Sequence, residues 1–287
     1  MSLKTDTFPA KKHWLSAGLK VVPANPKIFS KGALNEARKA FLAGSNQLTA
    51  IRNWMEGADL IASNGREYKL GALGVSMSDK DPELNTALSW WLVHIHLCLS
   101  ESFPYCAFFT SFDVDGNWMT PAEVEEALCA INKKLGFDLA DDTIANYFAG
   151  VDASFRPGHM LYMLGLIERR ESRREGTTAL MIRRTSVRPS RELIVYTALL
   201  LHRHRFKGQA TVATPELLKC GFARILGMRD TELRDQLNEM RHDKECSSLI
   251  EYTRKQDLDS IHFRRQGSAP LGDLREYCYN SGAVKWK

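Results

Sequence analysis

Apolar positions recur along most of this chain with the spacing of helices. In the segment NQLTAIRNWMEGADLI, the apolar side chains Leu48, Ile51 and Met55 lie three and four positions apart. This spacing places them on one face of an α-helix, while the polar positions fall on the other faces. We therefore predict an amphipathic helix here, with Ser45 or Asn46 as its N-cap.

Further segments also have helical patterns. The segment MTPAEVEEALCAINKKLG is the best marked, because Thr120 can cap it, Pro121 suits the first helical position and Glu123 completes a capping box. We predict other helices over 34–42, 81–100, 141–155, 190–208, 214–227 and 229–245. Pro82 suits the first turn of the 81–100 helix. The aromatic run at 105–112 is read as a strand or a buried connection, and the tail 267–287 as poorly ordered or peripherally docked.

Three hairpins interrupt these helices. The segments ASNGREYKL, LGLIERRESRREGTTALMIRR and SSLIEYTRKQDLDSIHF each contain two strand-like runs around a polar turn. Two helices followed by a hairpin describe a winged helix, so we predict a mainly α fold (α+β) with short β-hairpins and winged-helix-like modules. We expect three parts: an N-terminal winged-helix-like domain with an aromatic helix (1–104), a central helical unit ending in an arginine-rich hairpin (105–188), and a C-terminal helical unit with a terminal hairpin (189–287).

Composition places the chain among globular proteins. It has 287 residues, of which 44% are hydrophobic and 25% charged. The N-terminal residues lack the apolar stretch of a signal peptide, and the longest apolar helix is too short to span a bilayer. The six cysteines show no C-x-x-C spacing, so neither a disulfide framework nor a zinc site is indicated. We therefore expect a cytoplasmic protein that does not enter membranes.

Positive charge is concentrated in one segment. The whole chain has a formal net charge of +5, but residues 165–208 contain eleven Lys/Arg against four acidic residues. The remainder is thus slightly acidic. An exposed hairpin needs charge to keep its edge soluble, yet mixed charge would serve that purpose. An excess of arginine instead favours a surface for phosphate groups, and nucleic acid is the polyanion we expect.

The second helix of the first winged-helix-like module is a weaker candidate for DNA contact. Its polar side chains are types that contact bases or phosphates, although any solvent-facing helix surface has a similar composition. The predicted DNA-binding residues of this helix, the two basic hairpins and the basic helix end are Asn46, Gln47, Thr49, Arg52, Asn53, Arg66, Lys69, Arg169, Arg170, Arg173, Arg174, Arg183, Arg184, Arg203 and Arg205.

The acidic residues indicate a metal site less clearly than the arginines indicate a surface for phosphate groups. Asp113, Asp115 and Asn117 fit the first positions of a calcium loop, but Trp118 and Val124 occupy the positions that require Gly and Glu. These aspartates, or a second group at Asp138, Asp141 and Asp142, are candidates for Mg²⁺ in phosphodiester cleavage. Asp141 and Asp142 equally suit a helix N-terminus. The acidic stretches also allow an internal contact with the basic hairpin in place of DNA.

Several positions resemble the SspB-like family, a bacterial family associated with DNA phosphorothioation loci. The matching positions are Phe8, Pro9, Trp14, Leu15, Ile51, Arg52 and Trp54. The closing segments ARILGMRDTELRDQLNEM and SLIEYTRKQDLDSIHF are also similar, so the resemblance spans about residues 6–265. The chain departs from the family at Lys12, where arginine is common, and at AGSNQ, which replaces a glycine-rich start of the helix.

The resemblance implies a DNA-nicking component of a phosphorothioation and phage-defence system. Such a protein works with a P-loop ATPase and a sulfur-transfer enzyme similar to PAPS reductases, and a nickase implies Mg²⁺ or Mn²⁺. No catalytic residue is carried over, because the matching motifs are structural. Two alternatives stay open: a non-catalytic winged-helix adaptor or regulator that binds DNA and recruits an ATPase, and an arginine-rich contact for an acidic protein partner.

Overall fold

A computed structural model describes residues 4–100, 103–136, 139–174, 177–256, 258–266 and 268–286. The side chains of Arg174 and Thr177 lie outside the described part. Two of the residues predicted above are affected, because Asp138 and the side chain of Arg174 both fall outside it.

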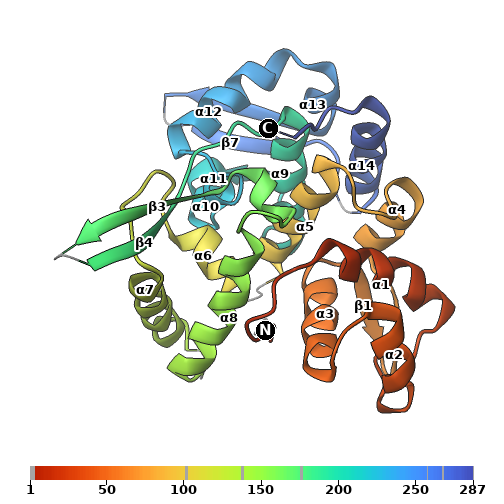
Figure 1. Ribbon diagram of the computed structural model, residues 1–287. Coiled ribbons are helices and arrows are strands. Elements are labelled where there is room, and N and C mark those ends of the chain that lie inside the picture. The colour runs from red at the N-terminus through yellow and green to blue at the C-terminus, as the bar shows by residue number, and fades with distance from the viewer. Residues whose placement is uncertain are drawn as a thin grey trace. The chain divides into compact units, whose positions relative to one another are not determined.

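The described elements are mostly helices, with three small sheets (Figure 1). This confirms the prediction of a mainly α fold with short hairpins. Tertiary contacts group the chain into two compact units. The first comprises Met1–Phe108, Asn117–Arg183 and Trp286–Lys287, and the second comprises Phe109–Gly116 and Arg184–Lys285. The division into three parts at 104 and 188 stays a prediction.

The N-terminal part of the first unit contains the predicted order of two helices and a hairpin. Its elements are α1 (Lys12–Ala24), η1 (Lys31–Ala33), α2 (Leu34–Phe41), α3 (Ser45–Gly57), β1 (Ile61–Asn64), β2 (Glu67–Leu70) and α4 (Ala72–Lys80). Strands β1 and β2 pair antiparallel, with Ile61 opposite Leu70 and Asn64 opposite Glu67. The order of elements is as expected, but the assignment as a winged helix stays a prediction.

The predicted cap of α3 is wrong by one residue. Gly44 is the N-cap, and Ser45 and Asn46 are the first residues of the helix. The side-chain oxygen of Gln47 accepts a hydrogen bond from the Gly44 N–H at 2.8 Å. Gln47 thus satisfies a donor that the helix itself leaves unpaired.

Helix α5 (Ala87–Leu99) belongs to the first unit and is buried at every position. It begins later than predicted, because Thr86 is its N-cap and Pro82 lies in the preceding turn. The Asp81 carboxylate fixes this turn by accepting hydrogen bonds from the Asn85 and Thr86 N–H groups and from the Ser89 hydroxyl, at 2.7–2.9 Å. Because these groups bond to Asp81, the helix does not begin before its N-cap at Thr86.

The aromatic run at 105–112 is a helix, α6 (Tyr105–Ser111), and the prediction of a strand or connection was wrong. Aromatic residues favour strands, but tertiary burial outweighs that preference here. Tyr105 and Phe108 are both buried. The Tyr105 hydroxyl lies 2.8 Å from His94 Nδ1, and the Phe108 ring packs against Phe148 at a centroid distance of 5.3 Å.

Two helices, of which α7 has a side-chain cap, precede the arginine-rich hairpin. The capping box of α7 (Pro121–Lys134) is confirmed, because the Glu123 carboxylate accepts the Thr120 N–H at 2.6 Å and Thr120 Oγ1 accepts the Glu123 N–H. The elements that follow are α8 (Asp141–Ser154), η2 (Leu161–Leu164), β3 (Ile167–Arg174) and β4 (Thr177–Arg184). Strands β3 and β4 pair with each other as predicted.

The second unit combines helices with a three-stranded sheet in the order β5-β7-β6. Its elements are α9 (Arg191–Arg205), β5 (Thr211–Ala213), α10 (Thr214–Lys219), α11 (Phe222–Ile225), α12 (Asp230–Glu239), η3 (Met240–His242), α13 (Lys244–Leu249), β6 (Ile250–Lys255), β7 (Leu258–Phe263) and α14 (Ala269–Ser281). The hairpin β6–β7 was predicted. The short strand β5 was not, and it pairs through Val212 opposite Ile261.

Two helices predicted in the second unit are interrupted. The segment 229–245 is divided into α12, η3 and the first residues of α13. The segment 214–227 is not one helix, because Gly221 has a φ of +86° and separates α10 from α11. The tail is a helix, α14, which packs on α9 and buries Leu271, Leu274 and Cys278. The Arg275 guanidinium donates a hydrogen bond to the Tyr196 hydroxyl at 3.0 Å. Across the described residues, no helix is both long enough and apolar enough to cross a membrane.

Candidate nucleic-acid interface

The arginines of the β3–β4 hairpin have three different environments. Arg169 is turned inward: its Nη2 lies 2.7 Å from Asp152 Oδ1 and donates to the Asp152 carbonyl at 3.0 Å. Only 14% of the Arg169 side chain and 4% of the Asp152 side chain are exposed. Arg156, one helical turn further along, contacts the other Asp152 oxygen at 2.7 Å. The Arg169 side chain therefore joins β3 to α8, and the prediction that it faces outward was wrong.

Arg184, at the end of β4, is 2% exposed. It donates hydrogen bonds to the carbonyls of Phe109 and Arg224, and its guanidinium lies 4.5 Å from the Phe109 ring centroid. Carbonyl oxygens and a ring face are both suitable partners for a buried guanidinium. The outward orientation predicted for Arg184 was therefore also wrong.

Two further arginines pack against the Trp118 ring. The guanidinium carbons of Arg170 and Arg183 lie 4.1 Å and 4.6 Å from the centroid of the Trp118 ring. Arg183 is also 2.9 Å from the Glu168 carboxylate, so its charge is partly offset. Arg170 is exposed. We call Trp118, Arg170 and Arg183 the Arg–Trp cluster.

The position of Trp118 is fixed by backbone pairing next to it. Met119 and Ile182 form an antiparallel bridge in which each N–H donates to the carbonyl of the other, at 3.0 Å and 2.7 Å. This bridge holds the segment before α7 against β4. No sequence signal predicted this bridge, because in the sequence Trp118 stands out only as the residue that breaks a calcium-loop pattern.

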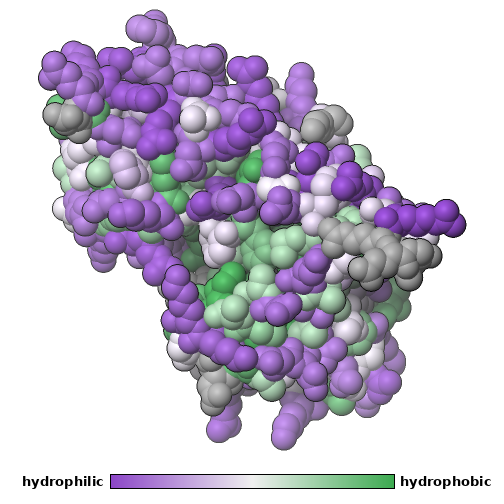
Figure 2. Space-filling view, turned by 90° about the vertical axis from the view of Figure 1, so that its left-hand side faces the viewer, coloured by the Kyte–Doolittle hydropathy of each residue, from purple (hydrophilic) through white to green (hydrophobic). Residues whose placement is uncertain are grey.

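Arg173 is the remaining hairpin arginine whose side chain is described. It is exposed. Neither Arg170 nor Arg173 has an ion pair with any residue in the described ranges. The side of the molecule on which β3 and β4 appear in Figure 1 is largely hydrophilic, with a hydrophobic area near the centre of the view (Figure 2).

The candidate residues on α3 are partly occupied by internal contacts. Asn53 donates to the Lys4 carbonyl at 2.6 Å, and Gln47 caps its own helix. Arg52 lies 3.8 Å from the Glu56 carboxylate. Burial raises the pKa of Glu56, and the charge of Arg52 opposes this effect. Arg52 and Thr49 also line a hollow of about 320 Å³ between α3 and the segment before α2.

The other predicted contacts are exposed but dispersed. Asn46 and Thr49 are exposed on α3. In the hairpin β1–β2, Arg66 is exposed in the turn and Lys69 on β2. Exposed arginines also end α9 in the second unit, at Arg203 and Arg205.

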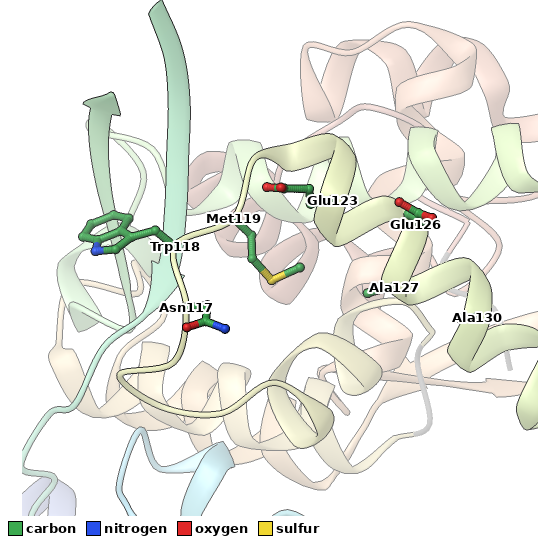
Figure 3. Close-up of a pocket in the computed structure, with 7 residues that line it drawn as sticks. All are labelled: Asn117, Trp118, Met119, Glu123, Glu126, Ala127 and Ala130. Carbon is green, nitrogen blue, oxygen red and sulfur yellow. The ribbon is translucent and has the colours of Figure 1, made fainter. Parts of the chain in front are cut away.

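A larger hollow of about 740 Å³ lies beside the Arg–Trp cluster (Figure 3). Its lining residues are Asn117, Trp118, Met119, Glu123, Glu126, Ala127 and Ala130. Figure 3 shows the Glu123 and Glu126 side chains on α7 and the Asn117 amide on the segment that precedes it, with the Trp118 indole toward the hairpin. The Glu123 carboxylate is engaged at the cap of α7, whereas Glu126 is exposed.

The aspartates considered for Mg²⁺ form ion pairs. Asp113 lies 3.0 Å from the Arg224 guanidinium, and Asp115 lies 3.1 Å from that of Arg229. Burial acts to raise the pKa of Asp115, but hydrogen bonds from Ser186 and the charge of Arg229 outweigh it, so this pKa lies below its ordinary value. A carboxylate neutralised by arginine is a poor ligand for a further cation.

Asp141 and Asp142 occupy the first turn of α8, where a helix favours negative charge. In the described part of the chain, no group of three or more His, Cys, Asp or Glu residues is arranged to hold a metal ion. No chemical step is therefore assigned to a metal ion at these residues.

Comparisons with known proteins identify the fold. No curated protein sequence matches the chain. A structure described as "Magnesium ion-bound SspB crystal structure" aligns with a TM-score of 0.75 and 17% identity, over 96% of this chain and 86% of that one. A second, described as "SspB crystal structure", aligns with a TM-score of 0.72 and 16% identity, over 97% of this chain and 90% of that one. At these identities the likeness is one of fold, and at that level the SspB-like assignment is confirmed. A family model matches residues 4–277, and the chain therefore belongs to the family described as "Protein of unknown function (DUF4007)".

Proposed function

We propose that this protein is the DNA-binding component of a bacterial phosphorothioation system. Arg170 and Arg173 carry the proposal, because they are exposed on β3 without an ion pair to any described residue. Arginine presents a planar set of donors that matches two phosphate oxygens at once. The fold shared with SspB structures supports the system to which we assign the protein.

The Arg–Trp cluster gives this contact a defined geometry. The Arg170 guanidinium lies 4.1 Å from the centroid of the Trp118 ring, which limits its motion while its charge stays exposed. A cation held in place loses less conformational freedom on binding than one on a mobile side chain. In this proposal Arg170 and Arg173 each contact a backbone phosphate, and Arg169 and Arg184 support the hairpin from within.

Nicking of one strand, to admit sulfur, is the enzymatic half of the proposal. It rests on the family resemblance and on a fold shared with a structure described as magnesium-bound. The same resemblance suggests a P-loop ATPase and a sulfur-transfer enzyme as partners. No residue is assigned to the cleavage step.

Duplex binding tests the first half. We would measure the fluorescence anisotropy of a labelled duplex of about 20 base pairs at low salt. The double variant Arg170→Ala/Arg173→Ala should bind at least about tenfold more weakly, because two phosphate contacts are lost. The control Arg241→Ala removes an exposed arginine of η3 and should bind as the wild type does. Unchanged binding by the double variant would contradict the proposal and favour an acidic protein partner.

A plasmid assay tests the second half separately. Supercoiled plasmid is incubated with the protein and Mg²⁺ or Mn²⁺, and the relaxed form is quantified on a gel. Accumulation of relaxed plasmid supports a nickase. If the protein binds the plasmid but does not relax it, with either metal and with the partner proteins added, the nickase proposal is rejected. The function that then remains is that of a DNA-binding adaptor.

A further inference from the structure

The hollow beside the Arg–Trp cluster has a charge pattern opposite to that of the hairpin. Among its described lining residues there is no lysine or arginine, and the charged ones are Glu123 and Glu126. The exposed cations Arg170 and Arg173 lie outside it on β3. A phosphate is therefore repelled from the hollow and attracted to the hairpin next to it.

The two regions meet at one side chain. Trp118 lines the hollow and also packs against the guanidinium of Arg170 at 4.1 Å. A ligand with an anionic part and a neutral part can therefore place the first on Arg170 and the second in the hollow. A nucleotide has this division, because its phosphate is charged and its base is neutral.

The hollow also has the surfaces that a base requires. Met119, Ala127 and Ala130 supply apolar contact, and Trp118 lies on the side of the hollow toward the hairpin. The Asn117 amide and the Glu126 carboxylate, both exposed, supply an acceptor-rich polar set. A volume of about 740 Å³ is ample for one base, since small-ligand sites measure about 300–1,000 Å³.

We infer that this hollow binds one unpaired guanine base displaced from the DNA duplex. Guanine presents adjacent N–H donors, at N1 and N2, which match the two oxygens of the Glu126 carboxylate. Adenine and cytosine each offer one amino group beside an acceptor nitrogen that a carboxylate repels. Thymine offers one N–H between two carbonyl oxygens. Bases removed from the duplex are read on this same edge in other proteins.

The inference rests on the proposed function, since the phosphates must be held for the base to reach the hollow. It adds a base preference that backbone contacts alone do not provide. Glu126 is the residue that would set this preference. Glu123 contributes less, because its carboxylate accepts hydrogen bonds from Thr120 at the start of α7.

The test uses labelled duplexes that carry a single bulged nucleotide. The bulge is G, A, C, T or an abasic site, and a fully paired duplex serves as reference. We expect the wild type to bind the G bulge about tenfold more tightly than the abasic bulge, which is the size of one good bidentate contact to a base. Glu126→Gln should lose this preference and keep its affinity for the paired duplex.

The control is Glu216→Gln, which changes an exposed glutamate of α10 outside the hollow. It should retain the preference for G. Equal affinity for all bulges, with the paired duplex still bound, would overturn the guanine site and leave the proposed function standing. A G preference that persists in Glu126→Gln would also overturn the assignment. Absence of binding to every duplex would reject the proposed function, and the inference with it.

Discussion

Arg169 Nη2 and Asp152 Oδ1 lie 2.7 Å apart beneath the hairpin β3–β4, and the Asp152 side chain is almost completely buried. This contact shows that part of the positive charge of segment 165–208 is neutralised inside the protein. The internal contact considered from the sequence is thus partly present, although its acceptor is an aspartate of α8 that had not been singled out. The surface available to a polyanion is accordingly smaller than the composition indicates.

We predict that Arg169→Ala lowers the free energy of unfolding by roughly 2–3 kcal/mol. Removal of one partner leaves a buried carboxylate poorly compensated, which costs about 3–5 kcal/mol when no other cation is near. Arg156 remains beside Asp152 and reduces the cost. Urea denaturation followed by circular dichroism measures the change. Arg173→Ala, at an exposed position of the same strand, should shift stability by less than about 0.5 kcal/mol. Equal effects of the two substitutions would contradict the buried role of Arg169.

The salt dependence of DNA binding should separate exposed from buried arginines. Arg170→Ala and Arg173→Ala should each reduce the slope of log affinity against log salt by about 0.9, the value for one phosphate contact to duplex DNA. Arg241→Ala should leave the slope unchanged. The measurement is a series of anisotropy titrations between about 50 and 200 mM salt. A slope that is the same in all four proteins would show that neither Arg170 nor Arg173 meets a phosphate.

Gly221 should tolerate no side chain. Its φ is +86°, and a β-carbon added there would lie 2.8 Å from Thr110 Cβ and 3.1 Å from Thr110 Cα. Gly208 has the same φ of +86° but no atom within 4 Å of an added β-carbon. Gly208→Ala should therefore cost only the backbone strain, about 1 kcal/mol, while Gly221→Ala should cost at least about 2 kcal/mol because it adds overpacking. The melting temperatures of the two variants, measured by thermal unfolding, test this difference. Equal melting temperatures would show that Thr110 yields to the new methyl group.

The stability of the second unit should depend on pH through Asp243. This residue caps α13, and the Cys246 N–H that it accepts at 3.0 Å lowers the pKa of Asp243 from its ordinary value of 3.8. A carboxyl group whose pKa is lower in the folded state stabilises the fold fully above its unfolded pKa. That contribution is lost as the pH falls through the lowered value.

Asp243→Asn keeps a capping side chain but does not ionise. We expect the variant to be less stable than the wild type at neutral pH. The difference between the two should narrow as the pH falls below 3.8. Urea unfolding at a series of pH values tests this. A difference that does not change over the acid range would show that the charge of Asp243 makes no contribution.

Local signals in the sequence predicted local structure well. The cap of α7 needs only Thr120, Pro121 and Glu123, which are neighbours in the chain, and it was found. The start of α5 was missed because it depends on how the Asp81 carboxylate collects donors from the following turn. Such a turn competes with the helix for the same N–H groups, and the apolar periodicity carries no sign of that competition.

The site depends on distant pairs and was predicted less completely. The count of charges located the basic hairpin, but it contained no information on which guanidinium meets a buried carboxylate. Trp118 lies 52 positions before Arg170 in the chain, so no short motif joins them. The strand β5 was missed for a similar reason, since three residues pair only because β7 lies beside them. The backbone bridge between Met119 and Ile182 is likewise invisible in the pattern of residues.

The bridge between Met119 and Ile182 affects how selectively the hollow binds a ligand. The Trp118 indole packs against the guanidinium groups of Arg170 and Arg183, and the backbone of the next residue, Met119, is paired with β4. A rigid binding surface discriminates between ligands by shape, because it does not adapt to a poor fit. Selection between ligands at the inferred guanine site therefore requires no closing movement of the protein.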